Sequence, residues 1–240
     1  QIIQENRLQR DQIKYIVHGT TVGTNAAIQR NGAKTGLITT KGFRDVLEIA
    51  RQTRPSLYDL YQDKPEPLVK RRHRREVEER ILYDGTIYKR IDIEGAEQQI
   101  DDLIGKGIKS IAVCFLHSYI NPEHEKMVKE IITEKYPDVY VSISSEVLPE
   151  YREYERLSTT ILNSYIGPVV SDYIDRFEKG LKRNNINLNP YISQSSGGIM
   201  SSSMTVKNPI RTALSGPSAG VTGAIYVSSL AGFENIITLD

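Results

Sequence analysis

A continuous apolar run in the middle of the chain constrains the fold more than any other feature. Residues 110–116, with the sequence SIAVCFL, carry no charge and have the length of one β-strand. Unbroken apolar strands are typical of parallel sheets that are covered on both faces. The run therefore predicts a layered α/β fold in which this strand is buried.

Helix-like and strand-like segments alternate on both sides of this run. Helical spacing of apolar residues is clear at Ile100, Leu103 and Ile104. We expect helices over residues 24–30, 43–51, 94–105, 122–135 and 151–183, the last interrupted at Gly167-Pro168, and a closely packed helix of small residues over 213–231. We expect further strands over residues 15–18, 35–39, 139–143, 191–194 and 236–239. This alternation favours a largely parallel sheet flanked by helices.

The composition excludes several classes of protein. The apolar runs are too short to span a membrane, and the opening QIIQENRLQR is no secretory signal. The single cysteine, Cys114, excludes an internal disulfide and a four-cysteine zinc site, and it fits a cytoplasmic protein. With 31 basic and 30 acidic residues there is no global field that would attract nucleic acid.

Both ends of the chain point to a longer protein. The sequence does not start with methionine, and its last residues, IITLD, resemble a buried strand cut at Asp240. We therefore expect a piece that is truncated at both ends.

Residues 216–220, GPSAG, fit the G-x-S-x-G pattern of a hydrolase nucleophile elbow. That elbow needs a later histidine, but all four histidines precede Ser218. Small residues that let a helix pack closely, with Pro217 near its start, explain the motif better. A helix start whose N–H groups face a phosphate is a further interpretation.

A polar loop, HGTT at residues 18–21, lies between an expected strand and an expected helix. Its hydroxyl and N–H groups suit an anion, and an ordinary threonine cap explains the loop equally well. No Gly-Lys-Ser/Thr follows, so the loop is not a Walker A motif.

Two other clusters have structural as well as functional interpretations. His117 and His124 follow the central strand, where ligands often bind, but a metal would need Glu123 or Glu125 as a third ligand. A hydrogen-bonding role for His117 is favoured. The charged run 70–80 favours a salt-bridged helix or a subunit interface over a nucleic-acid site.

Polar residues in the expected long helix indicate a cleft. Ser158, Thr159, Thr160 and Asn163 are poor helix formers, although an Arg152–Glu155 pair would support the helix. A helix face that lines a cleft explains their presence.

Taken together, six stretches resemble the hydantoinase A / 5-oxoprolinase family, in the family's order and over nearly the whole chain. They are HGTTVGTNAAIQRNGAKTGLITTKGFRDVLEIARQ, RHRREVEERI, FLHSYINPEHE, SEVLPEYREYERLSTTILNSYIGPVV, SQSSGGIMS and RTALSGPSAGVTGA. The resemblance implies an actin-like, sugar-kinase-like (ribonuclease H-like) ATPase lobe. It implies a domain over residues 1–196, incomplete at its start, and the beginning of a second domain over 197–240.

The resemblance also implies an activity. We expect an ATP-dependent cyclic amidase, a hydrolase of C–N bonds, which transfers a phosphoryl group from Mg-ATP to the amide oxygen before ring opening. The alternatives are a subunit of an ATP-dependent acetone or acetophenone carboxylase, and a non-catalytic assembly lobe. We expect a hydantoinase B-like partner subunit or domain and an oligomer. Because both phosphate motifs of the family are absent or cut, we expect the 240 residues alone to be inactive.

The site residues follow from the same resemblance. For catalysis they are His18, the first choice of general base, and Asp240, which is also expected near Mg²⁺. For ATP binding they are Thr20, Thr21, Asn25, Ser215, Gly216 and Gly220. For substrate binding they are Arg152, Glu155, Arg156, Asn163, Gly197 and Gly198.

Overall fold

The computed structural model describes residues 13–59 and 61–239. These residues form two compact units. Unit 2 comprises Gly32–Pro168, and unit 1 combines the segment up to Asn31 with the segment from Val169 onward. The expected domain boundary at residue 196 stays a prediction, and the compact units divide at other positions.

Unit 2 contains the parallel sheet that the sequence predicts. Its strands are β2 (Thr35–Thr40), β3 (Arg74–Val77), β6 (Ser110–Cys114) and β7 (Tyr140–Ile143), in the order β3-β2-β6-β7. All three neighbouring pairs are parallel. Every residue of β2 and β6 is buried, as expected for inner strands of a covered sheet.

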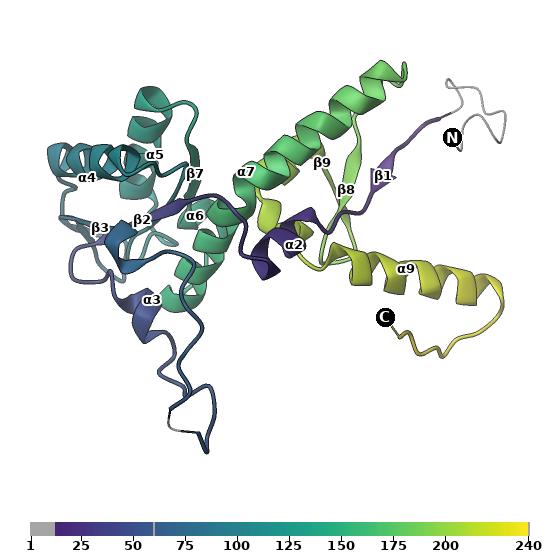
Figure 1. Cartoon of the computed structure of the whole chain (residues 1–240), viewed down its shortest axis with the longest axis horizontal. Coiled ribbons are helices and arrows are strands. Elements are labelled where there is room, and N and C mark those ends of the chain that lie inside the picture. Colours follow the sequence, from purple (N-terminus) through teal and green to yellow (C-terminus); the bar gives the residue numbers. More distant parts are fainter. Residues whose placement is uncertain (1–12, 60, 240) are drawn as a thin grey trace. The chain divides into compact units, whose positions relative to one another are not determined.

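Alternate residues of these strands enter two separate cores. Ile38, Ile111 and Val113 face the core to which α4 (Ile93–Gly105) and α5 (Glu123–Lys135) contribute. Figure 1 shows these two helices next to each other beside β7. The opposite residues, such as Leu37 and Ala112, pack with Leu157 and Ile161 of α7 (Glu153–Arg183). The period of two in a strand thus places helices on both faces of the sheet.

The helix ends of unit 2 have identifiable causes. Asp92 caps α4, because its carboxylate accepts the Gly95 N–H at 3.0 Å. The helix expected over 43–51 is reduced to α3 (Val46–Ile49), since Ala50 adopts a positive φ of 54°. Another short helix, α6 (Ser144–Val147), directly follows β7.

The charged run 70–80 does not form the expected helix. Arg71–His73 makes one 3-10 turn (η2), Arg74–Val77 forms β3, and β4 (Arg80–Ile81) pairs antiparallel with β5 (Ile87–Lys89). Contacts with neighbouring elements override the helical charge pattern: Glu76 accepts the Gly42 N–H at 2.8 Å, and Arg74 contacts Glu48 at 2.9 Å. Tertiary context often overrides local propensity in this way.

The expected interruption of the long helix at Pro168 is also absent. Helix α7 is continuous from Glu153 to Arg183 with Pro168 inside it. Proline lacks the N–H that would bond the carbonyl four residues earlier, that of Ser164. In the structure that carbonyl accepts the hydroxyl of Ser110 from β6 at 2.7 Å. The sheet therefore satisfies the group that proline leaves unpaired.

Two glycines of α7 provide a matched pair of substitutions. A Cβ on Gly167 would lie 2.4 Å from the ring of Tyr140, whereas one on Gly180 would meet open space. We expect Gly167→Ala to lower the free energy of unfolding by about 1–3 kcal/mol through overpacking. Gly180→Ala should raise it by about 0.5–1 kcal/mol, because alanine is the better helix former. Urea denaturation of both variants measures the difference, and equal shifts would contradict the close approach at Gly167.

Unit 1 holds a small mixed sheet. Strand β8 (Tyr191–Ser193) pairs parallel with β1 (Val17–His18) and antiparallel with β9 (Ile199–Ser201). The helices of this unit are α2 (Val22–Ile28), α8 (Ser202–Lys207), a 3-10 turn η3 (Pro209–Thr212), α9 (Ser215–Leu230) and the second half of α7. The sequence analysis did not expect β9 and α8, since their serine-rich sequence resembles a loop.

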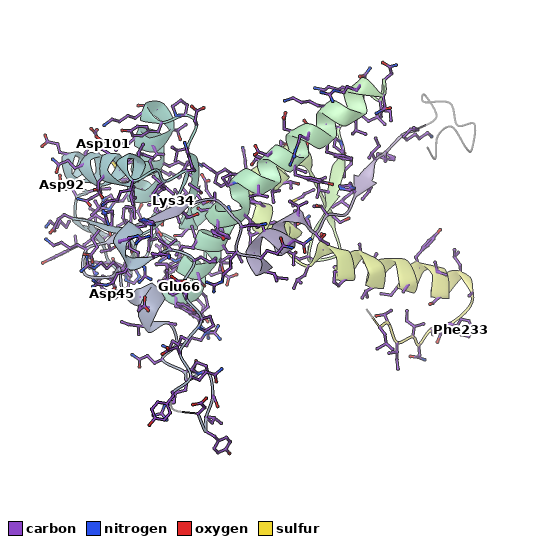
Figure 2. The ribbon with its side chains drawn as sticks, viewed as in Figure 1. Lys34, Asp45, Glu66, Asp92, Asp101 and Phe233 are labelled. Atoms are coloured by element: carbon purple, nitrogen blue, oxygen red, sulfur yellow. The ribbon has the colours of Figure 1, made fainter. Side chains whose placement is uncertain are left out.

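Two expectations about the end of the chain are wrong. Residues 236–239 are not in a strand, and Ile237 and Leu239 are almost fully exposed. Helix α9 does form, but it is not closely packed within the described residues, because Ile225, Tyr226 and Val227 are more than half exposed. Phe233, labelled in Figure 2 just beyond this helix, is exposed as well.

Within the described residues, no helix is long and apolar enough to cross a membrane.

Candidate functional site

The first predicted motif and the start of α9 lie together in unit 1. The Ser215 hydroxyl donates to the Thr20 carbonyl at 3.1 Å, and the Leu214 N–H donates to the Thr24 hydroxyl at 3.1 Å. Gly216 is so close that a Cβ on it would lie 3.8 Å from the Thr21 methyl group. Two stretches almost 200 residues apart thus place hydroxyls beside the N-terminus of α9. The first N–H groups of a helix have no intrahelical partner.

A glycine turn lies against the same helix. Gly197 has a φ of +83°, and a Cβ on it would come within 3.4 Å of the Ser218 and Thr222 hydroxyls. Glycine is therefore required here both by the backbone conformation and by space. Of the predicted glycines, Gly197 lies beside α9, whereas Gly216 and Gly220 lie inside it. The Asn25 amide donates to the Thr21 hydroxyl at 3.3 Å.

His18 has defined partners. Its Nε2 is 2.5 Å from the Tyr173 hydroxyl, and its ring stacks on Phe177 with the centroids 4.6 Å apart. Partial burial lowers the pKa of His18 below its usual value, so the neutral imidazole is favoured at pH 7. A neutral imidazole is the form that accepts a proton.

In unit 2, Arg156 lies in a fully buried polar network. Its guanidinium donates to the Ser144 hydroxyl at 2.6 Å, to the Phe115 carbonyl at 2.8 Å and to the Ser118 hydroxyl. Its Nη1 is 3.9 Å from the Glu125 carboxylate, and neither side chain is exposed. Glu125 in turn accepts the Phe115 N–H at 3.0 Å. The network joins α7 to the ends of β6 and β7.

The other predicted residues of α7 lie in different surroundings. Asn163 is buried and donates to the Ser142 hydroxyl of β7 at 3.0 Å. Glu155 is paired with Arg51 at 2.6 Å. A backbone hydrogen bond at Glu155 itself, and after it the hydrogen bond from Arg51, lower the pKa of its carboxyl. Arg152 has a φ of +78° just before the helix and stacks over the Tyr151 ring. The structure does not bring these residues to one surface, and their role in substrate binding stays a prediction.

A second buried pair lies at the same edge of the sheet. The Glu79 carboxylate contacts His124 Nδ1 at 2.8 Å and accepts a hydrogen bond from the Thr40 hydroxyl. All three side chains are buried. His124 is therefore bound to a carboxylate, while His117 bends the loop with a φ of +57°. Within the described residues, no group of three histidine, cysteine or acidic side chains could hold a metal ion.

A large cavity lies in unit 2, beside α7. Its volume is about 1010 Å³, and it is lined by α3, the first turns of α7 and the loop between α3 and η2. Figure 1 shows this loop extending away from the sheet below α3. The lining residues are Leu47, Glu48, Ala50, Thr53, Arg54, Pro55, Asp63, Lys64, Pro65, Glu66, Pro67, Leu68, Tyr154, Ser158 and Ile161.

Sequence reasoning missed part of these sites. It correctly rejected a nucleophile elbow at GPSAG. Ser218 lies inside α9, and a 3-10 turn precedes that helix, so a strand-to-helix elbow is absent at this serine. Glu79 and Thr40 could not be found, because they are single polar residues without a motif. The cavity was missed because its loop sequence has no regular pattern. Asp240 lies outside the described residues.

Comparison with known proteins identifies the family. Residues 1–136 match the hydantoinase/oxoprolinase N-terminal region, and residues 156–240 match the hydantoinase/oxoprolinase region. The chain belongs to the hydantoinase/oxoprolinase family. This confirms the resemblance that the six sequence stretches indicate.

Several relatives match almost the whole chain. An uncharacterised protein of Methanocaldococcus jannaschii is 42% identical over 99% of the chain and 35% of its own length. Caprolactamase subunit alpha of Pseudomonas jessenii is 32% identical over 93% of the chain and 32% of its own length. 5-Oxoprolinase 1 of Arabidopsis thaliana is 32% identical over 97% of the chain and 19% of its own length. The chain therefore spans about a third or less of the length of these relatives.

Solved structures agree with this assignment. The ATP-dependent caprolactamase from Pseudomonas jessenii is 30% identical, with a TM-score of 0.89 over 100% of this chain and 36% of that chain. Nucleotide-free acetone carboxylase is 28% identical, with a TM-score of 0.85 over 97% of this chain and 35% of that chain. The expected α/β ATPase fold with helices flanking a parallel sheet is confirmed.

Proposed function

We propose that this chain is part of an ATP-dependent enzyme that opens cyclic amides. The observation that carries the proposal is the structural match to an ATP-dependent caprolactamase over the whole chain. ATP supplies the phosphoryl group that converts a poor amide electrophile into a reactive one. The relatives named caprolactamase and 5-oxoprolinase favour ring opening as the outcome.

The cluster in unit 1 fits a phosphate. Its donors are the hydroxyls of Thr20, Thr21 and Ser218 and the Ser215 and Gly216 N–H groups at the start of α9, and the helix N-terminus carries a partial positive charge. Gly197 and Gly216 keep the backbone accessible there, since neither has a side chain. We propose that these residues bind and orient the phosphates, which positions the reaction without covalent chemistry.

A Mg²⁺ site is not formed by the described residues, because they contain no suitable group of acidic ligands. We propose that Mg²⁺ arrives with the nucleotide, and we assign no step to a protein-bound metal. His18 remains the proposed proton acceptor. Its neutral imidazole is held by Tyr173 and Phe177, and its burial keeps the pKa below the usual value.

We also propose that activity requires a longer polypeptide and a partner. The chain spans 32% of caprolactamase subunit alpha, and that name implies further subunits in the relative. A hydantoinase B-like subunit is the proposed partner. The exposed apolar side chains of α9 are consistent with additional polypeptide around unit 1.

The test is a turnover assay on this chain and on a polypeptide extended to the length of the relatives, each with the partner subunit. We expect ring opening of a cyclic amide and stoichiometric ATP hydrolysis only with the extended polypeptide. His18→Ala should lower its kcat by about 10²–10⁴-fold if His18 is the proton acceptor. Bicarbonate-dependent carboxylation of a ketone, without ring opening, would instead support the carboxylase alternative. Turnover of cyclic amides without ATP would contradict the proposal.

A further inference from the structure

An asparagine followed by a glycine, Asn31-Gly32, lies shortly after the end of α2. Asn31 is the only asparagine of the chain that precedes a glycine. In such a pair the glycine backbone nitrogen can attack the side-chain amide carbon, because glycine has no side chain to hinder the approach. The nitrogen gives up its proton as the C–N bond closes a succinimide ring, and the amide nitrogen takes up a proton and leaves as ammonia. Water then opens the ring to aspartate or isoaspartate.

The attacking nitrogen is free in the folded chain. Within the residues that the structure describes, the Gly32 N–H donates no hydrogen bond, whereas the next N–H, that of Ala33, donates to the Tyr165 carbonyl at 2.9 Å. The Asn31 side chain is exposed, and its amide donates to the exposed Gln29 side chain at 3.1 Å. Both reacting groups therefore have the freedom that ring closure requires.

The turn between β4 and β5 shows the opposite arrangement for a related pair. Asp84-Gly85 is the only Asp-Gly pair of the chain, and Asp84 is exposed, as Asn31 is. Here the glycine N–H donates to the Leu82 carbonyl at 3.0 Å, and the Asp84 carboxylate accepts the Thr86 N–H at 3.0 Å. Both hydrogen bonds must break before the nitrogen can attack the side chain. This turn is a protected counterpart of the Asn31-Gly32 segment.

The chain at Gly32 has no room for additional atoms. A Cβ on Gly32 would lie 2.4 Å from the ring of Tyr165 and 2.6 Å from its carbonyl oxygen. Isoaspartate routes the main chain through the former side chain, which adds one methylene to the backbone directly before Gly32. Extra atoms in a closely packed place force their neighbours to shift. The hydrogen bond from Ala33 to Tyr165, just before β2, is the contact that such a shift would break.

We propose that Asn31-Gly32 is a site of spontaneous deamidation in the folded protein, and that its isoaspartate product weakens the packing of Gly32 on Tyr165. Water is the only other reactant. The chain passes from unit 1 to unit 2 at this peptide bond, so the modification changes one of the two chain connections between the units. The inference does not depend on the proposed function, because no step involves ATP or turnover.

Asp84→Asn provides the matched comparison, because it places the same reacting pair in the hydrogen-bonded turn. The variant is incubated at pH 8 in heavy-oxygen water, folded and in guanidinium chloride, and mass spectrometry of its peptides follows each conversion. In the folded chain, position 31 should convert at least about tenfold faster than position 84, since hydrogen bonds hold the second pair. In guanidinium chloride the two rates should be similar. Equal rates at the two positions in the folded chain, or conversion at position 31 as slow as at Asn25 inside α2, would overturn the proposal.

A second measurement separates the backbone change from the added charge. Asn31→Asp introduces the charge without the extra methylene, and Asn31→Gln keeps an amide whose ring closure is disfavoured because the ring would be larger. The aged chain, shown to contain isoaspartate by an isoaspartate-specific methyltransferase, should unfold at a lower urea concentration than the fresh chain. Asn31→Asp should unfold like the fresh chain, and Asn31→Gln should not change on ageing. Unfolding of the aged chain at the same urea concentration as Asn31→Asp, or an equal loss in aged Asn31→Gln, would overturn the proposed effect on packing.

Discussion

Replacing Arg156 with methionine is expected to lower the free energy of unfolding by about 3–5 kcal/mol. The two side chains are similar in length, so the packing volume is largely kept. The substitution leaves the Glu125 carboxylate, which is not exposed, without its cation, and it removes the donors that reach Ser144 and the Phe115 carbonyl. An uncompensated charge in a buried site is costly, because water cannot replace the lost partner. Urea denaturation followed by circular dichroism measures this change.

An exposed ion pair to a residue of the same helix provides the control. Arg51 and Glu155 form an ion pair whose arginine side chain is 64% exposed. Arg51→Met should change the free energy of unfolding by about 1 kcal/mol at most, since exposed pairs contribute little. Combining Arg156→Met with Glu125→Gln should recover part of the loss, because the buried charge is then removed as well. Equal effects at Arg156 and Arg51 would show that the network is not buried.

The thiol of Cys114 is expected to resist alkylation in the folded chain. Burial raises the pKa of this thiol to about 12, compared with an ordinary value of 9.0. Three pKa units reduce the reactive thiolate about a thousandfold at a given pH, and burial within β6 also blocks access to the reagent. Labelling with iodoacetamide at pH 8, followed by mass spectrometry, should therefore proceed at least about a thousandfold more slowly than in guanidinium chloride.

An introduced cysteine provides an internal control for the labelling rate of Cys114. Ser229→Cys on the exposed surface of α9 should label at the rate of an ordinary thiol in the same sample. If Cys114 labelled as fast as that cysteine under native conditions, β6 could not be the inner strand of the sheet. The labelling rate of Cys114 in urea would further report the unfolding of unit 2.

Much of the fold of unit 2 could be predicted from the sequence. The apolar run 110–116 correctly indicated β6 as a buried inner strand, and the helices expected over 94–105 and 122–135 are observed as α4 and α5. The charged run 70–80 was misjudged, because its charges are satisfied by α3 and by the loop after β2 and not along one helix face. A local sequence pattern indicates a contact only when both partners belong to the same periodic segment.

The candidate sites divide in a similar way. Family motifs indicated Thr20, Thr21 and Gly216, and the structure places these residues together at the start of α9. The motifs gave no warning that Arg156 and Asn163 are buried among polar groups of the sheet. They also did not indicate the cavity beside α7, whose walls come from three separate segments.

The sequence by itself determined the family, the alternation of strands and helices, and the burial of the central strand. These properties follow from short-range periodicity and from motifs whose residues are close in the chain. The tertiary structure alone decided that α7 runs through Pro168, because the Ser110 hydroxyl of β6 satisfies the Ser164 carbonyl that proline leaves free. It likewise decided which charges are buried, since a carboxylate such as Glu125 enters the interior only where several donors from distant segments converge on it.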